Sequence, residues 1–272
     1  MAHAASSING DADPRDVWPL AREAAEHAVA LNDDLAEAQH ALGVVNWQFE
    51  WNWPVGERAL RQAVALDPSY SLAHLILGHL LSQSGRHAEA EPVMRRARDL
   101  DPLNPMSFAL SSQVAFQTRD YTAALELAGR SITLGPQFWI GYQMSGQAHE
   151  RLGHDDLALQ ALASAAQLSR QNSKPVSLSG YILGRAGRTA EARHVLNTLK
   201  TTADRYVPPY ALALVHAGLG DEDALFESLE RAYRERDVHL MFLPVDPKWD
   251  PYREDPRFAA LLAQGGFTAT ER

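Results

Sequence analysis

Small and apolar residues recur along the chain at intervals of 34 positions. One column of small residues consists of Gly56, Ala90, Ala124, Ala158 and Ala192. A second column consists of Ala63, Ala97, Ser131, Ala165 and Leu199. Within each interval the apolar residues have the spacing of helices that bury one face. A repeat of this length predicts stacked helix pairs, because one pair cannot bury its own apolar face and neighbouring pairs bury it together.

Turn-forming residues divide the intervals into pairs of helices. Glycine takes up the left-handed conformation that ends a helix at little conformational cost. The glycines expected in such turns are Gly85, Gly153, Gly187 and Gly220. Proline stops a helix because it lacks an N–H group and clashes with the preceding turn. The prolines expected to close successive units are Pro68, Pro102 and Pro136.

This helix-turn-helix unit resembles the tetratricopeptide repeat. The clearest copy, Ser71 to Asn104, has Gly78 and Ala90 where its two helices cross, Ala97 near its end, and a closing Pro102. The other copies are residues 36–70, 105–138, 139–172, 173–205 and 206–236. The resemblance implies an all-α fold, a right-handed α-solenoid of about six helix pairs over residues 15–236, with a C-terminal helical cap.

The two ends of the chain depart from the repeat. Residues 1–14 are small and polar and are predicted to be disordered. Arg15 to Leu31 has the apolar stripe of a second helix without its partner, so we expect a divergent cap or a fragment of a longer protein. Residues 237–272 are predicted to form a capping segment over the apolar end of the array. The residues expected to cover that end are Met241, Phe242, Leu243, Trp249 and Phe258.

One unit carries an insertion, and the tail narrows the resemblance. The turn of unit 36–70 holds one extra residue in the sequence FEWNWPVGE, where Phe49, Trp51 and Trp53 are expected to form a hydrophobic plug. This insertion and residues 206–267 resemble a group of bacterial multidomain regulators. In that group a tetratricopeptide array follows a winged-helix DNA-binding domain, a serine/threonine kinase or a nucleotide cyclase. The resemblance implies a fused effector domain in a longer parent protein.

Charge and composition exclude several classes of protein. The formal net charge of −9 argues against a nucleic-acid-binding surface, which needs clustered lysine and arginine. The chain has no cysteine, so it has no disulfide and no thiolate site. The N-terminus lacks the basic and apolar regions of a signal peptide, and no apolar run is long enough to span a membrane. We therefore expect a cytoplasmic protein without a membrane partner, and a periplasmic location stays open.

The sequence lacks the motifs of common catalytic, metal and cofactor sites. HExxH, GxxxxGK followed by serine or threonine, and GxSxG do not occur. His74 and His79 lie five residues apart and project in different directions from one helix. Paired carboxylates such as Asp155-Asp156 follow turn glycines, where they cap the next helix. We predict no catalytic, metal or cofactor-binding residue, and no enzyme activity.

The resemblance also implies a concave groove lined by the first helix of each pair. Its predicted residues are His40, Trp47, Gln48, His79, Gln83, Gln113, Phe116, Gln117, Gln143, Gln147, Glu150, Arg151, Tyr181, Arg185 and Tyr210. The glutamine amides both donate and accept hydrogen bonds, as a peptide backbone requires. The aromatic side chains supply binding anchors, and the two arginines suit a carboxylate or phosphate.

These observations leave three hypotheses of function. The first is a non-catalytic scaffold or regulatory module that binds a protein or peptide segment in the concave groove. The second is a regulatory domain that senses a small molecule within a larger signalling or transcription-regulating protein. The third is self-association through an exposed apolar end of the array.

Overall fold

The computed structural model describes residue 9 and residues 11–267, and every regular element in this part of the chain is helical. The first half contains α2 (Pro14–Leu31), α3 (Ala36–Gln48), α4 (Trp53–Leu66), α5 (Ser71–Gln83), α6 (His87–Leu100), α7 (Pro105–Gln117) and α8 (Tyr121–Leu134). The second half contains α9 (Trp139–Arg151), α10 (Asp155–Leu168), α11 (Ser173–Arg185), α12 (Thr189–Thr201), α13 (Pro209–Leu219) and α14 (Glu222–Arg234). The chain ends with two 3-10 helices, η1 (Val238–Phe242) and η2 (Pro247–Tyr252), and with α15 (Pro256–Gln264). None of the described helices is both long and apolar enough to cross a membrane.

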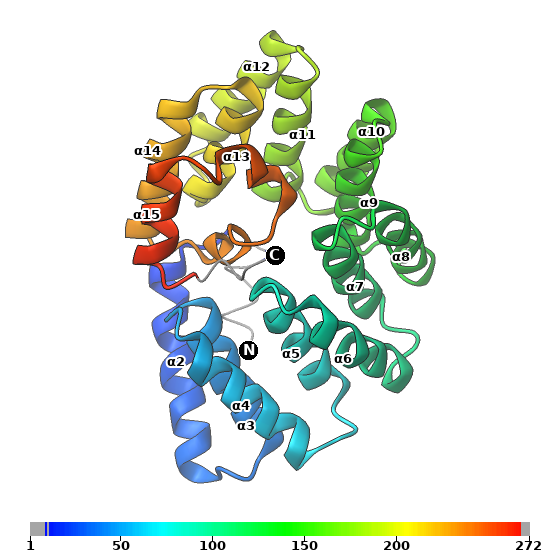
Figure 1. Ribbon diagram of the computed structural model, residues 1–272, viewed down its shortest axis with the longest axis vertical. Coiled ribbons are helices and arrows are strands. Elements are labelled where there is room, and N and C mark those ends of the chain that lie inside the picture. The colour runs from blue at the N-terminus through cyan, green and yellow to red at the C-terminus, as the bar shows by residue number, and fades with distance from the viewer. Residues whose placement is uncertain (1–8, 10, 268–272) are drawn as a thin grey trace.

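The helices form successive pairs, from α3 with α4 to α13 with α14, and α2 packs against α3 of the first pair (Figure 1). The predicted small columns lie where paired helices cross. A Cβ atom added to Gly78 of α5 would lie 2.6 Å from the sulfur of Met94 on α6. Ala90 and Ala97 are fully buried in the same pair. Larger side chains at these positions would push the helix axes apart. Small residues therefore recur every 34 positions, at the crossing in each helix pair.

The turns within pairs confirm all four expected left-handed glycines. Gly85 and Gly153 have φ angles of 76° and 78°. At the equivalent turn between α7 and α8, Arg119 has a φ angle of 65°. A left-handed conformation costs a residue other than glycine about 1–2 kcal/mol. The contacts that the Arg119 side chain makes with the C-terminal segment offset this cost.

Trp51 joins the two ends of the array. The array curves until α14 and α15 lie beside the first helices (Figure 1). Trp51 stacks on Tyr233 with ring centroids 5.4 Å apart, and its ring lies 5.1 Å from that of Phe267. The guanidinium of Arg236 lies 4.5 Å above the Trp51 ring. Trp51 therefore packs on the far end of the chain and not in a single local plug, whereas Phe49 stacks on nearby Trp18 and Trp53 lies against Trp47.

Residues 237–267 cross the concave face as well as covering the last pair. Trp249 and Phe258 share a hydrophobic cluster with Leu225 and Leu229 of α14. Met241 instead shares a cluster with residues of α5, and the Phe242 ring lies 6.0 Å from that of His79. Met241 and Phe242 thus do not cover the end of the array, because the curvature brings the concave face of α5 within their reach.

The start of the described chain is also held in place. The Asp11 carboxylate accepts a hydrogen bond of 2.8 Å from the Ser173 backbone N–H, and Asn172 donates to the carbonyl of Asn9. Pro14 is the first residue of α2. The segment predicted to be disordered, residues 1–14, therefore includes positions that contact α11, and its residues 1–8 and 10 lie outside the described residues.

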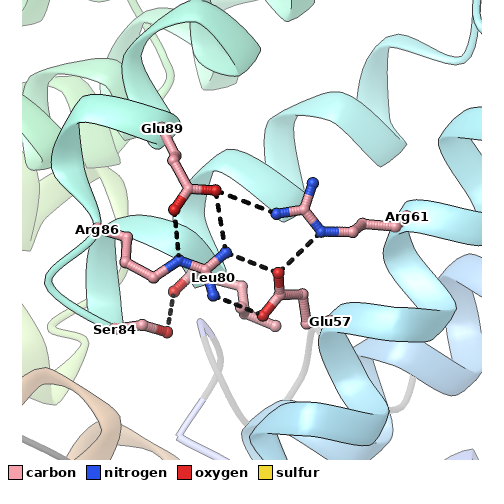
Figure 2. A network of polar contacts seen from close by, with 6 residues as sticks. All are labelled: Glu57, Arg61, Leu80, Ser84, Arg86 and Glu89. Atoms are coloured by element: carbon pink, nitrogen blue, oxygen red, sulfur yellow. Dashed lines mark hydrogen bonds and ion pairs between the residues drawn. The ribbon is translucent and has the colours of Figure 1, made fainter.

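Ion pairs on the outer surface connect the first two pairs (Figure 2). Arg86, just before α6, donates hydrogen bonds of 2.8 Å and 2.6 Å to the two carboxylate oxygens of Glu57 on α4. Arg61 also bonds Glu57, at 2.8 Å, and Glu89 bonds Arg86. The hydrogen bonds from Arg86 lower the pKa of Glu57 below its ordinary value of 4.5.

We expect Trp51→Ala to destabilise the fold by about 3–5 kcal/mol, because it removes a large buried ring that connects the two ends. Trp51→Phe keeps an aromatic ring and should recover most of the loss. Urea unfolding measures both variants. A change below about 1 kcal/mol for Trp51→Ala would contradict the closure of the array through this residue.

Glu57→Gln should destabilise the fold at pH 7 by about 0.5–1 kcal/mol, the range for a partly exposed ion pair. A carboxylate whose pKa is lowered on folding stabilises the fold above its ordinary pKa. This contribution is lost as the pH falls through the folded value, so the difference from wild type should shrink below pH 4.5. Glu23→Gln, on the exposed side of α2 and without an ion pair to the described residues, is the matched control. Equal unfolding curves for Glu57→Gln and wild type at pH 7 would contradict the role of the pair.

Candidate ligand cavity

The inner helices and the C-terminal segment line a half-open cavity of about 430 Å³. Its walls come from the first helix of each pair, α3, α5, α7, α9, α11 and α13, and from η1 and η2. These inner helices pack on their partner helices with one face and line the cavity with another. They therefore carry apolar residues on several sides, unlike a surface helix with a single stripe. In α13, for example, ten consecutive residues from Pro209 to Gly218 are buried.

The wall of the cavity is mainly apolar. Five of the inner helices and η1 contribute Leu72, Ile76, Met106, Leu110, Trp139, Ile140, Met144, Leu178, Leu214, Met241 and Phe242. Volumes of about 300–1,000 Å³ with apolar walls and a few polar groups are typical of small-molecule sites. The cavity has this size and this character.

Seven of the predicted groove residues line the cavity. They are His40, Gln48, His79, Gln113, Gln143, Gln147 and Tyr210. The amide of Gln147 donates to the amide oxygen of Gln113 across neighbouring repeats, at 3.2 Å. The structure therefore brings part of the predicted amide row together on the concave side of α7 and α9.

The other predicted residues do not line it. Trp47, Gln83, Phe116 and Gln117 are buried within the array. Gln117, for instance, accepts a hydrogen bond of 2.6 Å from Ser82 of the preceding repeat. Phe116 lies under the ammonium group of Lys248, which is 4.8 Å from its ring centre. The C-terminal segment thus covers a part of the concave face that the sequence predicted to be an open groove.

A second group of predicted residues is occupied with internal ion pairs. Glu150 contacts Arg151 at 3.0 Å and Arg185 at 3.4 Å. Arg151 also donates to the hydroxyl of Tyr181 at 3.1 Å. Burial raises the pKa of Glu150, although the two arginines oppose this effect. In this arrangement the arginines neutralise Glu150 and do not point into the cavity.

Arg119 holds the C-terminal segment over the concave face. Its guanidinium donates to both carboxylate oxygens of Asp250, each at 2.9 Å, and to the carbonyl of Val245 at 3.0 Å. Both bonds to Asp250 come from one guanidinium nitrogen, and the other terminal nitrogen binds Val245, so the side chain holds two points of the segment. The indole N–H of Trp249 donates to the Tyr210 hydroxyl at 2.9 Å. The segment from Val245 to Asp250 is therefore tied to both sides of the array.

Of the two lysines in the cavity wall, one forms an ion pair and the other binds a neutral amide. The ammonium of Lys248 lies 2.6 Å from the Asp246 carboxylate, and both side chains are buried. Lys174 donates to the side-chain oxygen of Asn9 at 3.2 Å. Burial lowers the pKa of Lys174 to about 8. Periodicity could not place these groups, because Asn9, Asp246 and Lys248 reach the cavity from outside the repeats.

Several buried polar atoms of the wall have no hydrogen-bond partner among the described residues. They are Nε2 of His40, Oε1 of Gln48, Oε1 of Gln143 and Nε2 of His239. Burial lowers the pKa of His40 and of His79 to about 4, so both rings are neutral at pH 7. Within the described residues, no group of three or more histidine, aspartate or glutamate side chains could hold a metal ion.

Comparisons with known proteins agree with the repeat architecture. A family model described as tetratricopeptide repeat matches residues 52–105. PilF of Pseudomonas aeruginosa has a similar structure, with a TM-score of 0.55 and 18% identity over 77% of this chain and 96% of that chain. A chain of the APC/C hetero-tetramer Cut9–Hcn1 aligns with a TM-score of 0.62 and 18% identity, over 91% of this chain and 46% of that chain.

No curated protein sequence matches the chain. At these identities the structural likeness concerns the fold alone. The matched repeat model, the 34-residue columns and the stacked pairs agree with one another. The fold is therefore an α-solenoid of stacked helix pairs, and residues 52–105 match the tetratricopeptide repeat.

Proposed function

We propose that the chain is a non-catalytic binding module whose ligand is a small molecule held in the central cavity. The observation that carries the proposal is an apolar, half-open cavity of about 430 Å³ that the chain's own C-terminal segment partly covers. Buried polar atoms without partners among the described residues lie in its wall. A ligand that hydrogen-bonds them would remove a desolvation penalty that the free chain carries.

The position of the C-terminal segment favours a small ligand over a long peptide. An extended peptide along the whole concave face would need the surface that Lys248 and Asp250 cover. A molecule of limited size needs only the volume of the cavity. The hypothesis of a small-molecule-sensing module therefore fits the geometry better than a fully open peptide groove.

Three polar groups of the cavity, His40, His79 and Lys248, suit binding better than catalysis. A general base that works near neutral pH needs a pKa close to the operating pH. Burial holds the pKa of His40 and of His79 near 4. Lys248 is neutralised by Asp246. These groups orient and select a ligand without being poised to move protons.

Ligand binding would strengthen the closed form of the array. A molecule in the cavity contacts Met241 and Phe242 of the C-terminal segment and inner helices from several repeats at once. Binding to the closed form alone stabilises it according to ligand concentration. In a longer parent protein, this change in rigidity is what a fused effector would sense.

We expect Leu110→Trp to fill the cavity and weaken ligand binding at least about tenfold, since the larger ring would occupy ligand volume. The probe is N-phenyl-1-naphthylamine, an uncharged apolar fluorophore that brightens in apolar sites. Leu157→Trp is the matched control, because Leu157 is exposed on α10. Circular dichroism verifies that both variants fold. Equal probe binding by wild type and Leu110→Trp would contradict the proposal.

A second candidate is exchange of the C-terminal segment for a similar segment of a partner protein. The contacts of Arg119 with Asp250 and Val245, and of Lys248 with Phe116, support it, because they are those of a groove that holds a peptide. An intramolecular segment has a high effective concentration, so a partner would compete only after that hold is weakened.

For this candidate we expect Asp250→Asn to increase binding of a labelled peptide with the sequence of residues 243–252, since the substitution weakens the internal segment. The added Arg119→Ala substitution removes the partner of the peptide carboxylate and should abolish the gain. Fluorescence anisotropy measures both. If Asp250→Asn binds the peptide no better than wild type, the segment is a permanent part of the fold.

A further inference from the structure

We infer that the cavity selects an uncharged, largely apolar ligand that donates hydrogen bonds through a hydroxyl or N–H group. This inference rests on the proposed function and names the chemical class of its ligand. The inference rests on the balance of charge around the cavity and on whether the buried polar atoms in its wall donate or accept hydrogen bonds.

The charged groups around the cavity carry more negative than positive charge, although Lys174 donates only to the neutral Asn9 amide and has no ion pair within the described residues. Lys248 is paired with Asp246 at 2.6 Å. The carboxylates of Asp11 and Asp237 both act on the charge of Lys174. Around this volume the two lysines therefore face three carboxylates. A carboxylate or phosphate would be placed beside buried negative charge or would have to break an existing pair, and both are unfavourable at low dielectric.

His239 places an unpartnered ring nitrogen, Nε2, in the wall of the cavity. Its Nδ1 lies 2.7 Å from Oδ1 of Asp237. A carboxylate only accepts hydrogen bonds, so Nδ1 carries the proton, and in the neutral imidazole Nε2 is left as an acceptor. The ring is 5% exposed, and Nε2 has no partner among the described residues. Asp237 is itself fixed, because its other oxygen accepts from the backbone N–H of Tyr210 at 3.0 Å.

Two amides add further acceptors. Oε1 of Gln48 and Oε1 of Gln143 are buried in the wall without a partner among the described residues. Nε2 of His40 also lacks a partner among the described residues, but it is an acceptor only in the tautomer whose Nδ1–H donates to the Tyr70 hydroxyl, 3.2 Å away. These acceptors need donors from a ligand, because an unpaired buried polar atom is unfavourable.

The apolar residues of the wall and the volume of the cavity determine the apolar part of the ligand. Between the polar atoms lie the side chains of Ile76, Leu110, Met144 and Phe242. A water molecule takes about 30 Å³ in the liquid, so the cavity has the volume of roughly fourteen waters. A molecule with two or three rings and one or two hydroxyl or N–H groups matches this volume and chemistry.

The test compares three dyes with one ring system. N-phenyl-1-naphthylamine is uncharged and has one N–H donor. Its N-methyl derivative lacks the donor, and 8-anilinonaphthalene-1-sulfonate adds a negative charge. We expect wild type to bind the first dye at least about tenfold more tightly than the sulfonate. The first dye should also bind roughly threefold to tenfold more tightly than the N-methyl derivative, as one hydrogen bond contributes. Tighter or equal binding of the sulfonate, or no preference for the N–H dye, would overturn the inference.

Substitutions of the acceptor residues test whether these residues cause the preference for the N–H dye. In the double variant His239→Phe and Gln143→Leu, the preference for the N–H dye over its N-methyl derivative should disappear. A merely structural effect would weaken both dyes equally and keep the preference, which would contradict the assignment. Gln143→Leu alone replaces the double variant if circular dichroism reports unfolding, and it should reduce the same preference.

The Leu110→Trp variant separates failure of the ligand class from failure of the proposed function. If this variant binds every dye as wild type does, the dyes lie elsewhere and the cavity is not the binding site. If it loses binding while wild type prefers the sulfonate, the cavity is the site and only the ligand class is wrong. If the variant loses binding and wild type prefers the N–H dye, the result supports both the cavity as the binding site and the inferred ligand class.

Discussion

The contact between Trp51 and the last helices is the constraint on which the rest of the structure depends. Stacking of helix pairs does not by itself bring the two ends of an array together, because each pair contacts only its neighbours. Here Trp51 has a φ angle of 55° and packs against Tyr233 and Phe267. A bulky residue in this conformation is strained by about 1–3 kcal/mol. Contact with the far end of the chain offsets that strain and closes the array.

Closure explains why the concave face becomes a cavity. With the ends joined, the segment after α14 passes across the concave face (Figure 1). On that face Arg119 binds Asp250, and Lys248 lies over Phe116. Arg119 has a left-handed conformation at a turn where equivalent turns have glycine, and its side chain holds the segment in place. The apolar faces of the inner helices are then covered in part by the chain itself, and a half-open volume remains.

Local periodicity explains how much of this could be predicted. The close approach of Gly78 to Met94 and the left-handed Gly85 follow from a spacing that is visible in the sequence. The same spacing identified the inner helices, so residues such as Gln113 and Gln147 were correctly placed on the concave side. Contacts between distant segments leave no periodic pattern. The sequence therefore did not indicate that Lys248 would cover Phe116 or that His239 would reach the cavity.

The position of the C-terminal segment is the central claim, and a distance measurement in solution tests it most directly. The chain has no cysteine, so spin labels can be attached to single cysteines introduced at the exposed positions Thr118 and Glu254 without other changes. These positions flank the Arg119–Asp250 ion pair. Pulsed electron paramagnetic resonance should give one short and narrow distance distribution. A long and broad distribution would mean that the segment does not close the concave face.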